Sequence, residues 1–235
     1  MTFHADRFGG ICISVAGESV SECVEIAKQN EANADVIEIR LDTIRDAAVP
    51  PFLEAMRRPL LFTNRSRTEG GQFQGSEPDR LALLAEAVDH GAALVDLEVK
   101  TDDEFKRPLI AKAKAKGTGV ILSWHHFHDT PSRQALESIL QEQYKSGADI
   151  GKIVTTARDF AAVLRVLSLQ TVAAEIGFPL IAFCMGPVGV ISRVATLELN
   201  GYMTYAAPEN ARQTAPGQIP ATTLTRILKD LRHGD

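Results

Sequence analysis

Short apolar runs alternate with longer amphipathic segments along most of the chain. Most of these runs are 5–7 residues long and almost continuously hydrophobic, a pattern typical of parallel strands that are buried on both faces. We therefore expect eight β-strands, at residues 10–15, 36–41, 60–64, 93–99, 119–124, 149–154, 179–184 and 202–206.

The segments between these runs have the spacing and the end signals of α-helices. Ser19 stands three residues before Glu22, as in a capping box, and Pro78 follows Ser76 in the first turn of another helix. Glycines such as Gly91 end helices, because glycine adopts left-handed backbone angles at low cost. The predicted helices span residues 20–29, 77–90, 104–116, 133–146, 160–175 and 222–232.

Strand and helix alternate in about eight units of roughly 25–30 residues each. This count predicts a single (β/α)8 TIM barrel that occupies residues 1–235 as one domain. An open, doubly wound parallel sheet has the same alternation, but the G-x-G-x-x-G sequence that often follows its first strand is absent. No internal repeat or linker divides the chain.

Composition narrows the class of protein without indicating an activity. The 235 residues carry a net charge of -5, with 45% hydrophobic and 23% charged residues, which excludes collagen-like, disordered and membrane-spanning chains. The mild acidity argues against nucleic acid or an anionic membrane as a partner. The length alone fits one barrel or two small domains.

Two further features predict a cytoplasmic protein with reduced thiols. The first residues lack the basic and apolar regions of an export signal. Cys12, Cys23 and Cys184 are scattered and form no C-x-x-C pair. We therefore expect neither a disulfide framework nor a metal site.

The active site of a barrel of parallel strands lies at the C-terminal ends of the strands, and this chain has polar residues there. Four of them, Glu38, Arg40, Asp96 and Glu98, alternate with apolar residues along their strands. They could equally form a charged layer inside the barrel with no catalytic role. The candidates in chain order are Ser14, Glu38, Arg40, Arg65, Glu69, Asp96, Glu98, His125, His126, Lys152 and Arg193.

Lys152 stands out among these candidates because it lies within an apolar strand, in the sequence DIGKIV. Lysine is seldom buried without a partner or a function, since removing its ammonium from water is costly. It is therefore either ion-paired, with Glu38 or Glu98, or a nucleophile that forms an imine with a carbonyl substrate. The histidines at the end of the preceding strand favour the imine, because imine chemistry needs an acid and a base.

Two loops near the C-terminus are candidates for binding an anion. The glycine-rich turn at residues 184–193 can present backbone N–H groups to an anion, and Arg193 adds a guanidinium for a carboxylate or a phosphate. The loop TAPGQIP at residues 214–220 is suited to a lid, with Gln218 as its polar contact. The residues alone thus predict a barrel enzyme that acts on a small anionic carbonyl compound through an imine.

Six short motifs follow one another along nearly the whole chain: EIRLD at 38–42, RSRTEGG at 65–71, SWHHFHDTP at 123–131, ADIGKI at 148–153, GVISR at 189–193 and APGQ at 215–218. This series resembles, in content and order, the motifs of the type I 3-dehydroquinate dehydratases (3-dehydroquinases) of the shikimate pathway. Any one motif is weak evidence, but six in order are highly specific.

The resemblance implies a reaction and its catalytic residues. Lys152 would form an imine with the C3 ketone of 3-dehydroquinate, and His125 would take a proton from C2 and deliver one to the departing C1 hydroxyl. This syn elimination gives 3-dehydroshikimate. The protonated imine is the electron sink, so no cofactor and no metal are expected. Glu69 would orient the histidine.

The resemblance also implies the residues that bind the substrate, and the assembly. Arg193 and Gln218 would hold the substrate carboxylate, and Thr214 stands where the family commonly has a serine in its lid. Besides the small-molecule substrate, the expected partner is a second copy of the chain, in a homodimer. The residues expected to contact the ring hydroxyls and to order the pocket are Ser14, Glu38, Arg40 and Arg65.

One departure from the family pattern affects the choice of the base. The family usually has an aspartate after its catalytic histidine, whereas this chain has His126. If that aspartate raises the basicity of the imidazole, its loss lowers the affinity of His125 for protons. The register with Ser123 favours His125 over His126 as the base, and we expect His128 on the surface of the loop.

Two other functions are compatible with parts of the pattern. A Schiff-base aldolase acting on a sugar phosphate would bind phosphate at the GPVG turn and often has a second lysine near the imine, yet only Lys100 lies near a strand end. A catalytically inactive barrel that serves as a binding protein need not retain Lys152, His125, Glu69 and Arg193 together. The dehydratase is therefore the leading prediction.

Overall fold

Eight parallel strands form the centre of the protein. The computed structural model describes residues 10–232 and places each strand within one or two residues of its predicted bounds. The strands are β1 (Gly10–Val15), β2 (Val36–Arg40), β3 (Leu60–Thr63), β4 (Leu94–Glu98), β5 (Gly119–His126), β6 (Ile150–Thr156), β7 (Leu180–Met185) and β8 (Met203–Ala206).

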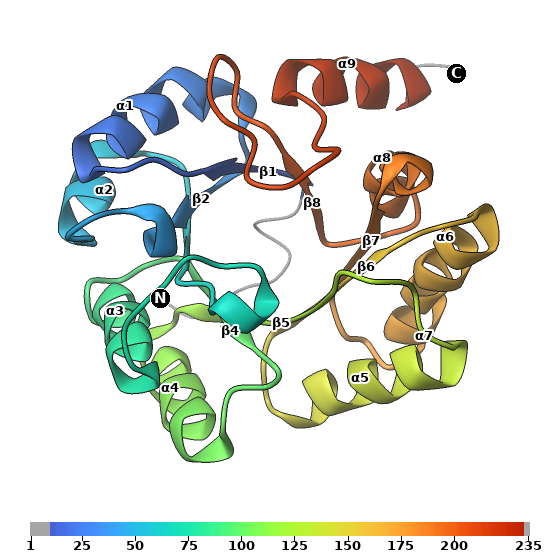
Figure 1. The fold of residues 1–235 in the computed structure, drawn as a ribbon, viewed down its shortest axis with the longest axis horizontal. Helices are drawn as coiled ribbons and strands as arrows, with labels where there is room; N and C mark the ends of the chain where they lie inside the picture. The colour runs from blue at the N-terminus through green and yellow to red at the C-terminus, as the bar shows by residue number, and fades with distance from the viewer. Residues whose placement is uncertain (1–9, 233–235) are drawn as a thin grey trace.

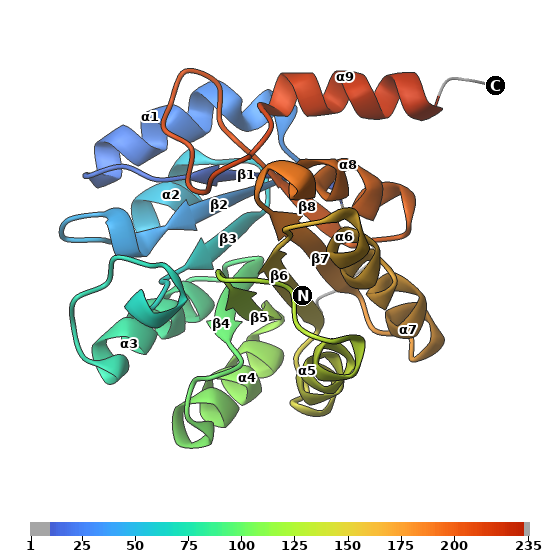
Figure 2. The same cartoon turned by 45° about the vertical axis from the view of Figure 1, so that its right-hand side comes forward.

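The strands are arranged in a ring, which Figures 1 and 2 show from two directions. Each strand from β1 to β6 pairs in parallel with the next along the chain, and β8 pairs with β1. Between β7 and β8 the Tyr202 backbone N–H donates to the Leu180 carbonyl at 2.9 Å, so the ring is nearly closed. The predicted (β/α)8 barrel is confirmed, and the alternative of an open doubly wound sheet is wrong.

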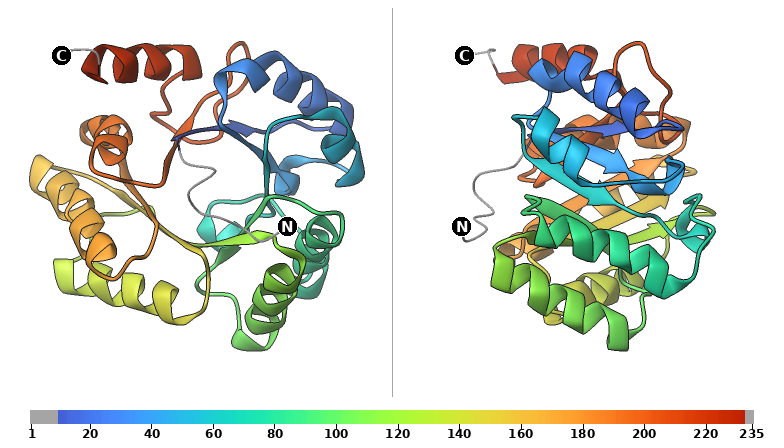
Figure 3. Two further views of the ribbon diagram at one scale, coloured as in Figure 1. Left: turned by 180° about the vertical axis from the view of Figure 1, so that it is seen from behind. Right: turned by 90° about the vertical axis from the view of Figure 1, so that its left-hand side faces the viewer.

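Helices surround the ring of strands on its outside (Figures 1 and 3). Ser76 accepts a hydrogen bond from the Asp79 N–H and forms a complete capping box with it. Ser19 accepts from the Glu22 N–H, but the Glu22 carboxylate accepts from the Glu18 N–H instead of from Ser19. The helices are α1 (Val20–Asn30), α2 (Pro50–Ala55), α3 (Glu77–Asp89), α4 (Asp103–Lys116), α5 (Arg133–Lys145), α6 (Phe160–Leu167), α7 (Leu169–Glu175), α8 (Val190–Glu198) and α9 (Ala221–Arg232).

One predicted helix is divided, α2 was not among the predicted helices, and β5 and β6 each extend two residues beyond their predicted ends. The predicted helix 160–175 is divided at Ser168 into α6 and α7, and α2 has six residues, too few to show an amphipathic period. β5 continues two residues beyond its predicted end, because its polar residues still pair in the sheet, His125 with Val154 and His126 with Thr155. β5 therefore carries both histidines.

Inside the barrel, side chains from alternate strands form layers. The third layer, from the even-numbered strands, consists of Glu38, Asp96, Lys152 and Tyr205. Beneath it lie two apolar layers, in which each large buried side chain stabilises the fold by about 1.5–3 kcal/mol. The polar site thus stands on an apolar floor, made of Cys12, Val36, Leu61, Leu94, Ile121, Ile150, Ile181 and Met203.

A second apolar core lies between the outer faces of the strands and the surrounding helices. In this core Phe52 of α2 meets Phe62 of β3 edge to face, with ring centroids 6.2 Å apart. None of the helices within residues 10–232 has the length and apolar composition needed to cross a membrane.

Candidate active site

A cavity of about 90 Å³ opens at the C-terminal ends of the strands. Of the residues to which the family resemblance assigns a role, all line it except Ser14. One wall of the cavity is apolar, and its residues were not predicted from the sequence. The alternation of side chains along a strand could have indicated it, because Val154 follows Lys152 by two residues and therefore lies on the same face. This wall consists of Phe127, Val154, Phe183, Met185 and Tyr205.

Lys152 is buried in the wall of the cavity, with 4% of its surface exposed. Its Nζ donates to Asp96 Oδ2 at 3.1 Å and lies 4.0 Å from the centre of the Tyr205 ring. The prediction that Glu38 or Glu98 would pair with Lys152 is wrong. Asp96 shares the interior layer of Lys152, whereas Glu38 accepts from Ser14 and Thr63.

Asp96 joins Lys152 to a second cation, Arg65. The Arg65 guanidinium lies 2.8 Å from Asp96 Oδ2 and 3.4 Å from Glu98 Oε1. Burial alone would raise the pKa of Asp96, but Arg65 and Lys152 together hold that pKa well below its usual range. Ser123 Oγ donates to the other Asp96 oxygen at 2.5 Å. Asp96 therefore stays ionised and fixes both cations in place.

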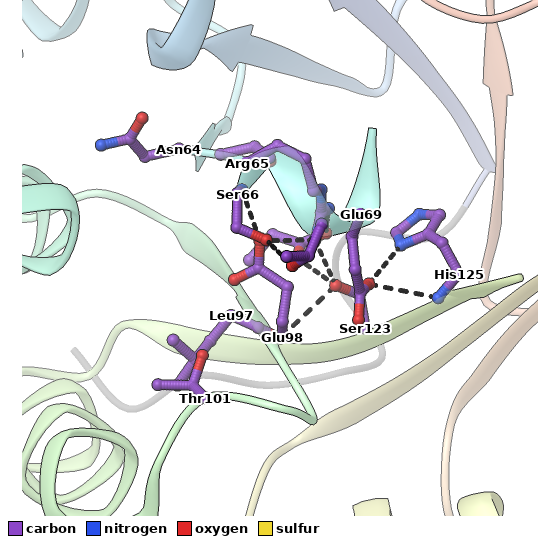
Figure 4. Close-up of polar contacts among 12 residues, drawn as sticks. Asn64, Arg65, Ser66, Glu69, Leu97, Glu98, Thr101, Ser123 and His125 are labelled. Atoms are coloured by element: carbon purple, nitrogen blue, oxygen red, sulfur yellow. Dashed lines mark hydrogen bonds and ion pairs between the residues drawn. The ribbon is translucent and has the colours of Figure 1, made fainter. Parts of the chain in front are cut away.

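His125 is held by the carboxylate of Glu69, as Figure 4 shows. Glu69 Oε2 lies 2.9 Å from His125 Nδ1 and also accepts from the His125 backbone N–H at 3.2 Å. Glu69 ends the short 3-10 helix Arg67–Glu69, and the left-handed backbone of Gly70 then turns the chain away. This geometry favours the tautomer with hydrogen on Nδ1, which leaves Nε2 free to accept a proton.

Burial and the surrounding charges shift the pKa values of both Glu69 and His125. Burial raises the pKa of Glu69 to about 7. Burial, followed by the charges of Arg65 and Lys152, lowers the pKa of His125 well below its ordinary value. The neutral imidazole is therefore the dominant form near neutral pH, as a general base requires.

His126 points away from the cavity because successive side chains of a strand lie on opposite faces. Its ring stacks on Trp124 with centroids 5.4 Å apart, and its Nε2 lies 3.0 Å from Asp129 Oδ1. His128 is exposed in the loop beyond β5. Of the two adjacent histidines, the structure brings His125 alone to the cavity.

Arg193 is a buried cation without a carboxylate. It is 1% exposed at the start of α8, and within residues 10–232 its contacts are the Tyr205 and Pro216 carbonyls, at 3.5 and 3.4 Å, and the face of Phe183. Its Nε has no hydrogen-bond partner among these residues. Burial lowers the pKa of Arg193 to about 10. Such a guanidinium favours an anionic ligand.

Gln218 and Thr214 lie in the loop 207–220, which passes beside α1 at the C-terminal side of the barrel (Figures 1 and 2). Gln218 Oε1 accepts from the Thr214 N–H at 3.0 Å, and its Nε2 donates to the Thr214 hydroxyl at 3.0 Å. The loop is anchored to α1 where the Glu209 N–H donates to Asn30 Oδ1. Both predicted lid residues thus face the cavity and hold their own loop.

The remaining predicted residues, Arg40, Glu38 and Ser14, lie on the β1–β2 side of the site. Arg40 makes two hydrogen bonds to Asp42, at 2.8 and 2.7 Å. Glu38 accepts from the Thr63 hydroxyl at 2.8 Å and from the Ser14 hydroxyl. Ser14 lies beside Glu38, its register partner on the neighbouring strand, and so orders the pocket through that carboxylate.

The chain as a whole matches one protein family. The family model described as Type I 3-dehydroquinase covers residues 11–235. The chain belongs to this family. A 3-dehydroquinate dehydratase from Desulfotalea psychrophila is 45% identical over 218 residues, which are 93% of this chain and 96% of that protein.

Solved structures of this family have the same architecture. The 3-dehydroquinate dehydratase of Geobacillus kaustophilus matches with a TM-score of 0.90 at 27% identity, over 97% of this chain and 92% of that one. The type I enzyme of Clostridium difficile, solved with covalently modified comenic acid, matches with a TM-score of 0.88 at 28% identity, over 97% and 93%. The resemblance inferred from the six motifs is confirmed.

In this member of the type I 3-dehydroquinase family, the turn after β7 is closed by its own hydrogen bonds. Ser192 Oγ accepts from the Cys184 N–H at 2.7 Å and donates to the Gly189 carbonyl at 2.5 Å. Met185 and Arg193 line the cavity, but the residues between them do not. Binding of an anion by this turn's backbone stays a prediction, and the turn leads to Arg193, which lines the cavity.

The described residues hold no cluster of metal-ligating side chains, and their cysteines are buried. Between residues 10 and 232, no group of three or more His, Cys, Asp or Glu side chains is arranged to hold a metal ion. The three cysteines are buried and not bonded to one another. The groups that line the cavity are an amine, an imidazole, carboxylates and guanidinium groups.

Proposed function

We propose that this chain is a 3-dehydroquinate dehydratase, a hydro-lyase that converts 3-dehydroquinate to 3-dehydroshikimate in the shikimate pathway. The observation that carries the proposal is the composition of one cavity. It combines the buried amine of Lys152 with the neutral imidazole of His125, which a carboxylate holds. It also contains the buried guanidinium of Arg193, which has no carboxylate partner within residues 10–232. A ketone that also bears a carboxylate and hydroxyl groups fits these three.

Binding of the substrate is proposed to use the charges that the protein leaves unmatched. The substrate carboxylate would take the free positions of Arg193, with Gln218 and Thr214 above it in the lid loop. The ring hydroxyls would meet Glu38 and Arg40 on the other side of the cavity. Arg65 orders the pocket through Asp96.

The first chemical step is proposed to be imine formation. The Lys152 ammonium gives one proton to His125, and the resulting amine attacks the C3 carbonyl carbon. His125 returns this proton, so that the oxygen leaves as water with it and a second proton from the nitrogen, and a protonated imine remains. Asp96, 3.1 Å from Nζ, balances the positive charge on this nitrogen. The covalently modified comenic acid in the Clostridium difficile relative supports a covalent route, and no cofactor is required.

Elimination follows from the acidity of the C–H bond next to the imine. His125 Nε2 takes the C2 proton, and the electron pair moves into the imine to give an enamine. The imidazolium, stabilised by Glu69 at 2.9 Å, returns the proton to the C1 hydroxyl, which leaves as water. A second water then hydrolyses the imine and frees Lys152, so the net change is the loss of one water molecule.

The cytoplasmic location and the homodimer remain predictions. An exposed apolar patch supports self-association, since Phe160 and Leu164 on α6 and Ile191 on α8 are 70%, 67% and 55% exposed. Sedimentation of the protein and of the Leu164→Ser variant tests the homodimer. A wild-type monomer at every concentration would contradict it.

The decisive experiment is reduction with borohydride in the presence of 3-dehydroquinate, followed by peptide mass mapping. We expect turnover, seen as the ultraviolet absorbance of the conjugated ketone, and a stable adduct on Lys152. Lys106→Met is the matched control, because Lys106 is also buried and ion-paired, with Asp103, but lies outside the cavity. It should keep both signals, whereas Lys152→Met should lose both.

The outcomes separate the alternatives. Turnover without an adduct would overturn the imine but not the dehydration. Absence of turnover, with an adduct from a sugar phosphate, would favour the aldolase, and absence of both would favour an inactive binding protein. Growth rescue of a strain that lacks the dehydratase tests the role in the pathway.

A further inference from the structure

Tyr205 of β8 lies against the nitrogen that the proposed function makes reactive. The Lys152 Nζ stands 4.0 Å from the centre of the Tyr205 ring. Tyr205 is 4% exposed and lines the cavity. Lys152 lies on β6, and its two partners are Asp96 on β4 and Tyr205 on β8. These two side chains therefore approach its nitrogen from opposite sides of one interior layer.

The polar surroundings of Lys152 are sparse for a buried ammonium. Within residues 10–232 its Nζ makes one hydrogen bond, to Asp96 Oδ2. The same oxygen lies 2.8 Å from the Arg65 guanidinium, so the charge of the carboxylate is shared between two cations. The face of an aromatic ring carries negative electrostatic potential and attracts a cation, most strongly where water is excluded. The ring is therefore the second electrostatic contact of the lysine.

The ring, and not the hydroxyl, makes this contact. The Tyr205 hydroxyl is buried and has no hydrogen-bond partner among the described residues. Burial raises the pKa of the Tyr205 phenol well above its ordinary value, so the ring remains neutral. An aromatic side chain without the hydroxyl would present the same face to Lys152.

We propose that Tyr205 is a positioning residue that holds the Lys152 nitrogen through the face of its ring, in the free ammonium and in the protonated imine. The inference rests on the proposed function, because it assigns the ring a role in the imine step. The imine nitrogen is a cation, whereas the attacking amine and the enamine are neutral. The ring therefore stabilises the electron sink more than the neutral states on either side, and so favours its formation.

The test compares four proteins by steady-state kinetics and by the rate at which borohydride traps the adduct. Tyr205→Phe should match the wild type within about twofold, since the face is retained. Tyr205→Leu should lower kcat and the trapping rate by about tenfold, with little change in KM. Phe183→Leu removes the neighbouring ring, whose centroid is 6.1 Å from that of Tyr205 and which lies under Arg193. It should raise KM instead.

A fluorinated series keeps the test independent of packing. Phenylalanine and its fluorinated analogues at position 205 have nearly the same shape, but each fluorine weakens the negative potential of the face. We expect the trapping rate to fall stepwise with fluorine content. Equal rates across the series, or a Tyr205→Leu variant that traps like the wild type, would overturn the inference. A wild type with turnover but without an adduct would overturn the imine and this inference with it.

Discussion

The buried charges of the cavity differ in what neutralises them, and this difference assigns their roles. Arg40 has its own carboxylate in Asp42, and Lys152 shares Asp96 with Arg65. Arg193 has none among the described residues. A cation that is already paired with a carboxylate of the protein orders the site, whereas a buried cation without such a partner favours binding of an anionic ligand.

The two adjacent histidines make the first prediction. His125→Ala should lower kcat by about a thousandfold, because it removes the base that lines the cavity. His126→Ala should keep most of the activity, since that ring stacks on Trp124 and pairs with Asp129 away from the cavity. Steady-state kinetics of both variants measure this, and the reverse result would move the base to His126.

The second prediction concerns the pH dependence of the same pair. The ionised Glu69 accepts the Nδ1 hydrogen of His125, and the pKa of Glu69 is about 7. As the pH falls through about 7, Glu69 takes up a proton and kcat/KM should decrease. The pKa of His125 lies lower, so the limb belongs to Glu69. In Glu69→Gln the limb should vanish and leave a lower, flat rate; its persistence would assign it to another group.

The sequence identified most of the residues of the site but not their pairing. Polar residues at strand ends and the six motifs locate Lys152, His125 and Arg193. The ion pair of Lys152 with Asp96 was missed, because the tilt of the strands decides which side chains share a layer. The wall residue Tyr205 was missed because an aromatic residue in an apolar strand reads as ordinary core.

At the scale of elements, a buried ion pair joins α3, β4 and the loop that carries Glu69. Arg80 of α3 is 2% exposed and lies 2.7 Å from Glu98 Oε2 on β4. The other Glu98 oxygen accepts from the Ser66 N–H at 2.9 Å, at the base of that loop (Figure 4). The position of Glu69 thus depends on a helix that contributes no residue to the lining of the cavity.

The third prediction tests this connection. Arg80→Leu should lower the free energy of unfolding by about 3 kcal/mol, because it leaves the buried Glu98 carboxylate with a weaker partner. Denaturation by urea measures the change. Arg45→Leu is the control, since its pair with Glu18 is exposed on both sides and should change stability within experimental error. Equal effects would mean that Glu98 is satisfied without Arg80.

The elements were more predictable than their exact ends. Long apolar strands and capped helices such as α3 are encoded locally, by periodicity and by Ser76. The short α2 and the division at Ser168 are not, because they depend on packing against the barrel. β5 shows the same limit, since its pairing with β6 extends over His125 and His126, where the apolar signal has ended.

At the scale of the whole molecule, the net charge of -5 describes the surface and not the site. The cavity is lined by Arg40, Arg65, Lys152 and Arg193 but also by Glu38 and Glu69. The preference for an anion therefore belongs to Arg193, which has no carboxylate partner among the described residues, and not to an excess of positive charge. Composition therefore excluded classes of protein but could not reveal the substrate, because a few buried residues set the chemistry.

The fourth prediction concerns the three buried cysteines. Burial raises the pKa values of Cys12 and Cys184, and raises that of Cys23 to about 12. A thiol-reactive disulfide reagent should label none of them in the native protein at about pH 8 and all three in guanidinium. Mass spectrometry after labelling measures this. Rapid native labelling of Cys12 would mean that the barrel floor opens without global unfolding.

The apolar floor has a consequence for how substrate enters the site and how product leaves it. Two apolar layers of side chains fill the barrel beneath Lys152, so within residues 10–232 the cavity opens at the C-terminal ends of the strands. Substrate, product and the water molecules of the proposed reaction therefore share this opening, beside the loop 207–220. A new substrate molecule can enter only after the product has left. The turnover rate therefore depends on product release as well as on the chemical steps.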